Sequence, residues 1–295
     1  MIIEAQVIDT LLSEVEMGEK KELRVCGVFS SAVYLRDDTM NVYLIHDRKY
    51  GLLPFGIGIA EDSTLLLDKK VVVGEGAFLS DRRLQLPASD LMFQLRPKTL
   101  TALFLQVPDQ RMVEDAVRRG NMHLKTGNKG IGVSLFWPED RLQDTSRRMI
   151  AARAAGELPV LRDALRQHCY ETICDVLRKL LGLGQGLTPS MDDFFVGVAY
   201  TLQYAQKHWQ FSLPEVALLS KAIKETAPQQ TCMFSVPYLL AAAEGKPFSI
   251  LEDVLNVSSV LLSDASLEKL LQVGHSSGSD MLTGILFGLK YLFSQ

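Results

Sequence analysis

Two stretches decide the fold of this chain: GLGQGLTPSMDDFFVG, from Gly182 to Gly197, and GHSSGSDMLTG, from Gly274 to Gly284. Each is a loop rich in glycine and hydroxyl side chains that reaches a serine, then an aspartate three residues later, then a glycine four residues after that. We call residues 182–193 and 274–280 the twin loops. Because the copies match in spacing, they predict two equivalent helix starts that face one shared site.

Both copies are predicted to open a helix with a capping box. In this arrangement a serine hydroxyl at the N-cap accepts the amide N–H three residues later, and an acidic side chain there reaches back to the N-cap amide. Ser190 with Asp193, and Ser277 with Asp280, have this spacing. Capping alone would explain these four residues without any ligand.

The apolar segments after the twin loops carry glycine at equivalent positions, Gly197 and Gly284. Glycine inside a helix costs about 1 kcal/mol relative to alanine, so its presence indicates that another backbone comes close. We expect the two helices to cross near these glycines as a pseudo-symmetric pair.

Capping leaves the other glycines and hydroxyls of the twin loops unexplained. Such a run before a helix exposes N–H donors beside the positive end of the helix dipole, which favours an oxyanion. The aspartates would repel a bare phosphate. The ligand is therefore expected to combine an anionic end with N–H donors, or to come with Mg²⁺, and whether a metal binds is left open.

A third segment, TCMFSVPYLLAAAEG, places Thr231 and Ser235 ahead of another predicted helix, with Ser235 as its N-cap. The candidate catalytic residues are His275, as a proton shuttle, with Asp193 and Asp280, which would orient N–H groups or a metal. The candidate ligand-binding residues are Gly184, Gly186, Thr188, Ser190, Asp192, Thr231, Ser235, Ser277 and Gly278.

The first third of the chain has the pattern of a β protein. From Leu23 to Leu95, short segments rich in Val, Ile, Leu and aromatic residues alternate with turn clusters, which is typical of β-strands. The expected strands include residues 63–68 and 69–78. Residues 101–108 add one more, and helices are expected at 111–127, 141–157 and 159–182. The predicted fold class is α+β, with an antiparallel β-rich barrel or sandwich over residues 1–110 and a mainly helical domain over 111–295.

Composition narrows the function classes. The chain has 295 residues, 47% of them hydrophobic, which suffices for two domains. A net charge of -4 without a dense basic cluster argues against nucleic-acid binding. The four cysteines fit no zinc or redox spacing. Since no secretory signal or long apolar segment is seen, we expect a cytoplasmic protein that does not bind membranes.

Three segments, GLTPSMDDFFVG, TCMFSVPYLLAAAEG and GHSSGSDMLTGILFG, occur in an order and at separations that resemble the AllH family. The resemblance covers about the last 120 residues. The first motif of the family usually reads GxGPGLTPSxDD, and here Gln185 stands where proline is common. This departure removes no functional group.

The resemblance implies a subunit of oxamate carbamoyltransferase, which converts oxalurate and phosphate into oxamate and carbamoyl phosphate during allantoin and purine ureide degradation. It also implies two other subunits, one of them similar to acyl-CoA synthetases, and a small anionic metabolite with a ureido or phosphate group. A resemblance to this family does not by itself determine the substrate.

Three hypotheses therefore stand. The chain is a subunit of a carbamoyltransferase, with the ligand held between the twin loops. Alternatively, it is a non-catalytic subunit that binds a metabolite or braces the assembly of an acyl-CoA-synthetase-like complex. The third hypothesis is a stand-alone metal-dependent hydrolase that uses the carboxylates of Asp192, Asp193 and Asp280.

Overall fold

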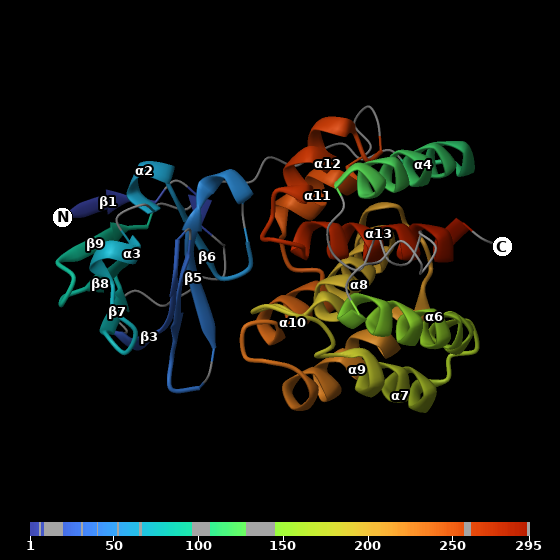
Figure 1. Cartoon of the computed structure of the whole chain (residues 1–295), viewed down its shortest axis with the longest axis horizontal. Coiled ribbons are helices and arrows are strands. Elements are labelled where there is room, and N and C mark those ends of the chain that lie inside the picture. The colour runs from blue at the N-terminus through green and yellow to red at the C-terminus, as the bar shows by residue number, and fades with distance from the viewer. Residues whose placement is uncertain are drawn as a thin grey trace. The chain divides into compact units, whose positions relative to one another are not determined.

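The computed structural model describes residues 1–5, 7–8, 20–30, 32–39, 41–51, 53–64, 67–95, 107–127, 145–256 and 261–293. The chain divides into two compact units (Figure 1). The β unit comprises Met1–Ala102 with Pro247–Ile250, and the helical unit comprises Leu103–Lys246 with Leu251–Gln295.

The described strands of the β unit form one sheet in the order β1-β9-β8-β7-β3-β4-β5-β6-β2. Its strands are β1 (Ile2–Glu4), β2 (Val7–Ile8), β3 (Lys21–Phe29), β4 (Ala32–Arg36), β5 (Val42–Asp47), β6 (Gly56–Ile59), β7 (Gly76–Ser80), β8 (Arg83–Leu86) and β9 (Leu91–Gln94). A short 3-10 turn, η1 (Arg48–Tyr50), follows β5.

The sheet is nearly closed into a barrel by the N-terminal segment. β1 pairs with β9 at one edge and β2 pairs with β6 at the other, although only two residues separate β1 from β2 in the chain. The two edge strands of the sheet are therefore only three and two residues long, and such short edges limit pairing with other chains. Side chains such as Val25, Leu35 and Phe93 are buried in the core of the unit. The predicted barrel-like β domain is thus confirmed.

Some local predictions in this unit are wrong. The pairs β1–β9 and β5–β6 are parallel, whereas the other described pairs are antiparallel as expected. The described parts of segment 63–68 belong to two short helices, α2 (Glu61–Thr64) and α3 (Leu67–Lys70), with acidic residues in each first turn, where the helix dipole favours them. Val72 and Val73, expected in a strand, are 68% and 60% exposed. Residues 101–106 of the strand expected at 101–108 lie outside the described residues.

The rest of the chain is mainly helical, as predicted. The longer helices are α4 (Gln110–Gly127), α6 (Thr145–Arg166), α7 (Tyr170–Leu180), α8 (Ser190–His208), α9 (Pro214–Gln230), α10 (Val236–Ala243), α11 (Ser249–Leu255), α12 (Asp264–Leu271) and α13 (Ser277–Phe293). Figure 1 shows α8 and α13 side by side in the helical unit, where α9 and α10 pack against α8, and α4 and α12 pack against α13.

One helix boundary differs from the prediction. Pro159 lies inside α6, and the helix expected at 159–182 is instead interrupted between Arg166 and Tyr170, where His168 has a φ of 53°. The cause is packing, because the buried face of α6 continues at helical spacing across Pro159, from Ala154 and Leu158 to Leu161 and Leu165. Burial of this face offsets the backbone hydrogen bond that proline cannot donate.

The crossing of α8 and α13 depends on two reciprocal glycines. A Cβ atom on Gly197 would overlap the carbonyl oxygen of Met281, and one on Gly284 would overlap the carbonyl oxygen of Phe194. Met281 and Phe194 occupy equivalent positions, since each directly follows the aspartate of its copy. The predicted crossing of a pseudo-symmetric helix pair at its glycines is therefore confirmed.

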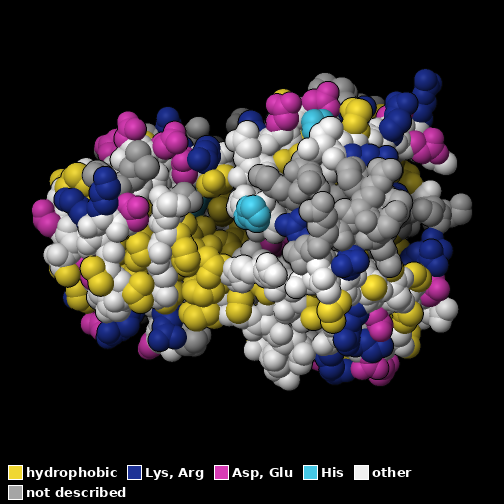
Figure 2. Space-filling model, viewed as in Figure 1, with side chains coloured by type: hydrophobic (Ala, Val, Ile, Leu, Met, Phe, Trp, Pro, Cys, Tyr) yellow, Lys and Arg dark blue, Asp and Glu magenta, His cyan; other side chains and the backbone are white. Residues whose placement is uncertain are grey.

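The surface carries both kinds of charge, as expected from nearly equal numbers of basic and acidic residues. On the face shown in Figure 2, cationic and anionic side chains are interspersed, and hydrophobic side chains gather over strands of the β unit. Within the part of the chain that the structure describes, no helix has both the length and the apolar character needed to cross a membrane.

The crossing yields a stability prediction. Gly284→Ala should lower the free energy of unfolding by at least about 2 kcal/mol, because the added methyl group forces two backbones apart. Gly156→Ala is the matched control, since Gly156 lies in α6 with no heavy atom within 4 Å of the added Cβ. This control should raise stability by about 0.5–1 kcal/mol. Urea denaturation of both variants measures the difference, and equal effects would contradict the close crossing.

Candidate functional site

The first of the twin loops starts its helix without the predicted capping box. Ser190 is the first residue of α8, and Pro189 stands at the N-cap with no side-chain cap bond. The Pro189 carbonyl accepts the amide N–H of Asp192 at 2.9 Å and that of Asp193 at 3.2 Å. Ser277 likewise is the first residue of α13, after Ser276. The capping-box prediction is wrong for the first copy because proline takes the N-cap, which leaves the Asp193 carboxyl for other contacts.

Asp192 joins the first loop to the segment between α9 and α10. Its Oδ1 accepts the amide N–H of Gly182 at 2.8 Å, and its Oδ2 accepts the hydroxyl of Thr231. Burial raises the pKa of Asp192, whereas hydrogen bonds from Thr231, Gly182 and Ser235 counteract the rise. With 1% of its surface exposed, this carboxyl holds loops together.

The same two segments meet through a thiol. The Cys232 Sγ donates to the Leu187 carbonyl at 2.8 Å. Sequence reasoning missed this contact, because a lone cysteine in a loop carries no pattern. Ser235 does stand at the N-cap of α10, as predicted, but its side chain makes no cap bond and turns to Asp192 instead.

The twin loops contact each other through three side chains. Thr188 Oγ1 donates to Asp193 Oδ2 at 2.9 Å and lies 3.1 Å from Ser277 Oγ. The Ser277 hydroxyl also bonds the Asp193 carboxyl. The structure thus brings Thr188, Asp193 and Ser277 together from segments about 90 residues apart in the chain. We call these three residues the hydroxyl–carboxyl cluster.

Two buried carboxyls lie at the equivalent positions of the helix pair. Asp193 is 2% exposed and Asp280 is fully buried. Burial, together with the negative charge of Asp280, raises the pKa of Asp193 well above its usual value, and bonds from Ser277 and Thr188 only partly oppose the rise. Like charges at close range disfavour double ionisation, so Asp193 keeps its proton to higher pH than an exposed aspartate does. The matching positions of the two aspartates were the sequence signal for this pair.

The glycines predicted to bind the ligand lie in two kinds of environment, closely packed or exposed. A Cβ on Gly184, whose φ is 137°, would overlap the amide nitrogen of Ser190, and a Cβ on Gly278 would overlap the carbonyl oxygen of Leu270 in α12. These two glycines allow close backbone packing. Gly186 is exposed, and its nearest non-neighbouring atom lies 3.9 Å from the ideal Cβ position, so the backbone there is open to solvent.

His275 stands apart from the hydroxyl–carboxyl cluster. It is exposed on the second loop, next to Gly274, whose φ is 59°. An added Cβ on Gly274 would lie 3.0 Å from Ser277 Oγ, so this loop backbone runs close to the cluster. His275 is thus an exposed side chain outside the three residues of the cluster.

The described side chains do not fit a metal centre. Within the residues that the structure covers, no group of three or more His, Cys, Asp or Glu side chains is placed to hold a metal ion. Asp192 instead bonds Gly182 and Thr231. The metal-dependent hydrolase hypothesis therefore has no geometric support among these residues.

Comparison with protein families finds a match for part of the helical unit. Residues 180–289 match the family model described as oxamate carbamoyltransferase subunit AllH. The match spans both twin loops and the segment between α9 and α10, so the resemblance of the three motifs to the AllH family is confirmed over this part of the chain. The description as a subunit indicates that family members act with other chains. No solved structure matches the chain.

The raised pKa of Asp193 predicts how stability depends on pH. Above pH 3.8 an unfolded aspartate loses its proton while folded Asp193 keeps it, so the folded state binds more protons. Wild-type stability should therefore fall, relative to Asp193→Asn, as pH rises above that value, by up to about 1.4 kcal/mol per pH unit. Urea denaturation across a pH series measures the difference.

The control for this experiment is Asp175→Asn, which removes an exposed negative charge from α7. A constant offset between wild type and Asp193→Asn at every pH would show that Asp193 gains no proton on folding.

Proposed function

We propose that this chain is a subunit of an oxamate carbamoyltransferase in allantoin degradation, and that its twin loops bind the anionic group of the substrate. The AllH family match supports the link to that enzyme. The substrate, oxalurate, and the second substrate, phosphate, are part of the proposal. Both are oxyanions, in line with the chemistry of the twin loops.

The contact between Thr188 Oγ1 and Ser277 Oγ carries this proposal. It joins the loops that start α8 and α13, where backbone N–H groups and helix dipoles favour negative charge. Both hydroxyls lie 3.1 Å apart and bond Asp193 in this structure, so each would turn its single hydrogen from Asp193 to the carboxylate or phosphate group when the ligand binds. The exposed backbone at Gly186 offers a solvent-facing approach to the first loop.

Asp193 acts as a positioning residue in this proposal. Since its carboxyl is buried and bonded to Thr188 and Ser277, it sets the direction of both hydroxyls. Burial, and after it the negative charge of Asp280, raises the pKa of Asp193. In this proposal Asp193 keeps its proton when the anion binds, and a neutral carboxylic acid repels an anion less than a carboxylate would.

The reaction requires one proton transfer at the leaving nitrogen. A phosphate oxygen attacks the carbamoyl carbon, a C–O bond forms, and the C–N bond to oxamate breaks. The electron pair goes to the oxamate nitrogen, which then takes up a proton. His275 is proposed as the proton carrier, because an imidazole both accepts and donates protons and this side chain faces solvent on the second loop.

The burial of the carboxyls supports a second candidate, a subunit that binds the metabolite while another chain performs the chemistry. Asp192, Asp193 and Asp280 are each no more than 2% exposed, so none of them faces a ligand directly. Assays of the purified chain against the complex with its two proposed partner subunits separate the candidates. Turnover of oxalurate by the chain alone would exclude a purely supporting role.

The proposed ligand contact predicts a loss of activity. Thr188→Val and Ser277→Ala should each lower kcat/KM for oxalurate in the reconstituted complex by about tenfold or more, because each removes a hydrogen bond to a charged group. The measurement is carbamoyl phosphate release at limiting oxalurate.

Thr226→Val is the matched control, since this buried hydroxyl of α9 donates to the Ala222 carbonyl of its own helix. It should change kcat/KM by no more than about twofold, as a substitution away from the ligand does. If Thr188→Val and Ser277→Ala behaved like this control, the twin loops would not bind the substrate.

A further inference from the structure

We infer that Ser190 and His275 form the half of the site that binds the N–H end of the substrate, a ureido or carboxamide group, while the hydroxyl–carboxyl cluster binds its anionic end. We call Ser190 and His275 the hydroxyl–imidazole pair. The inference rests on the proposed function, because it divides the site between the twin loops into two unlike halves. It assigns Ser190 as the residue that recognises the terminal amino group of oxalurate.

The two helix starts are related by pseudo-two-fold symmetry. The carbonyl of Pro189 accepts the amide N–H of Asp193 at 3.2 Å, and the carbonyl of Ser276, its equivalent, accepts that of Asp280 at 3.0 Å. Further along the helices, the contacts of the two crossing glycines are reciprocal. A contact made by a side chain of one copy therefore has an equivalent position on the other copy.

Ser190 is the equivalent of Ser277, but its hydroxyl is not used in the same way. Ser277 contacts Thr188 and bonds Asp193 of the other copy. Ser190 is only 9% exposed, yet its hydroxyl makes no hydrogen bond within the described ranges. Because of the symmetry, this hydroxyl faces the second loop, as that of Ser277 faces the first. A buried hydroxyl without a bond is a group that a ligand can satisfy.

His275 holds the place in the second loop that Thr188 holds in the first. Thr188 fills its half of the site by bonding Asp193 and contacting Ser277. His275 is exposed and makes no such bond among the residues that the structure covers, so the second half stays open to a bound molecule. An imidazole at the ureido end also lies where the proposed reaction needs a proton carrier, at the nitrogen of the bond that breaks.

Charge makes the two halves of the site unlike. Burial raises the pKa of Asp193, and the negative charge of Asp280 adds to the rise. When Asp193 keeps its proton, the negative charge of the pair lies at Asp280, on the side of the hydroxyl–imidazole pair. An anion is repelled there, whereas N–H groups are attracted. The terminal NH₂ of the substrate therefore donates to Ser190 Oγ, and its carboxylate lies against the hydroxyl–carboxyl cluster.

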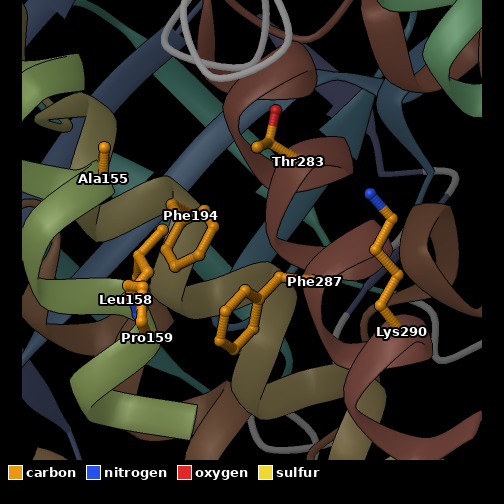
Figure 3. A pocket seen from close by; sticks show the side chains of 7 residues that line it. All are labelled: Ala155, Leu158, Pro159, Phe194, Thr283, Phe287 and Lys290. Atoms are coloured by element: carbon orange, nitrogen blue, oxygen red, sulfur yellow. The ribbon is translucent and has the colours of Figure 1, made fainter. Parts of the chain in front are cut away.

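The pocket between α6, α8 and α13 is not part of this site. Beyond Asp193 the two helices pack through aromatic rings, with the centroids of Phe194 and Phe287 5.6 Å apart. Figure 3 shows these rings in the wall of a pocket of about 240 Å³. The described lining of this pocket contains no residue of the twin loops. The substrate therefore reaches the hydroxyl–imidazole pair from the side of the loops.

Two ligands that differ at one end test this inference. In N-acetyloxamate a methyl group replaces the terminal amino group of oxalurate, and the carboxylate is unchanged. The reconstituted complex is titrated with each ligand by calorimetry in the absence of phosphate, so no carbamoyl phosphate forms. The wild type should bind oxalurate at least about tenfold more tightly, because the methyl group leaves the Ser190 hydroxyl without a bond.

Variants locate this preference in the site. Ser190→Ala should remove it and change the affinity for N-acetyloxamate by no more than about twofold. Thr188→Val should weaken both ligands by a similar factor, since it removes a contact to the carboxylate that they share. Ser263→Ala is the matched control, because this serine also starts a helix, α12, where its hydroxyl accepts the amide N–H of Ser266 at 3.3 Å. It should leave both affinities unchanged, and circular dichroism confirms that each variant folds.

The outcomes separate the inference from the function on which it rests. Equal affinity of the wild type for the two ligands, which needs no variant, would overturn the inference, and so would an unchanged preference in Ser190→Ala. Both results leave the proposed function standing if Thr188→Val weakens the two ligands. If the complex bound neither ligand, or if Thr188→Val and Ser277→Ala weakened neither, the proposed function would be wrong, and the inference with it.

Discussion

The close crossing of α8 and α13 is the constraint on which the helical unit depends. Gly197 and Gly284 let each helix backbone reach the other, where any side chain would clash. Because the contact is reciprocal, it fixes the relative register of the two helices and so brings Ser277 to Thr188. The site is thus a consequence of packing, and the glycines of the helices matter to it as much as the polar residues of the loops.

This geometry has an energetic cost, since it buries equivalent carboxyls on both helices. Burying an isolated ionised carboxylate costs several kcal/mol, so burial favours the protonated form of the carboxyl. The raised pKa of Asp193 follows from this cost of burial. Hydrogen bonds from Thr188 and Ser277 partly offset the cost, and they link the protonation state of Asp193 to the hydroxyls that are proposed to bind substrate. Perturbed carboxyls of this kind concentrate at functional sites.

Several of these features could be predicted from the sequence and others could not. The barrel-like β unit and the glycine crossing follow from local pattern and from the repeated spacing. The two helix starts follow as well, since α8 begins at Ser190 and α13 at Ser277. The capping box of the first copy did not follow, because Pro189 takes the N-cap that Ser190 was expected to occupy. The continuity of α6 through Pro159 was also missed, since tertiary packing of a long apolar face overrides a local helix breaker. The tie between Asp192 and Thr231 joins distant segments that no local signal connects.

The most direct measurement is a double-mutant cycle on oxalurate affinity, with Thr188→Val, Ser277→Ala and the double variant in the reconstituted complex. If both hydroxyls bind the same anionic group, the two losses should be non-additive, with a coupling energy of at least about 1 kcal/mol. Losses that add within about 0.5 kcal/mol would mean that the two loops act separately. Such a result would contradict the claim that the helix crossing builds one shared site.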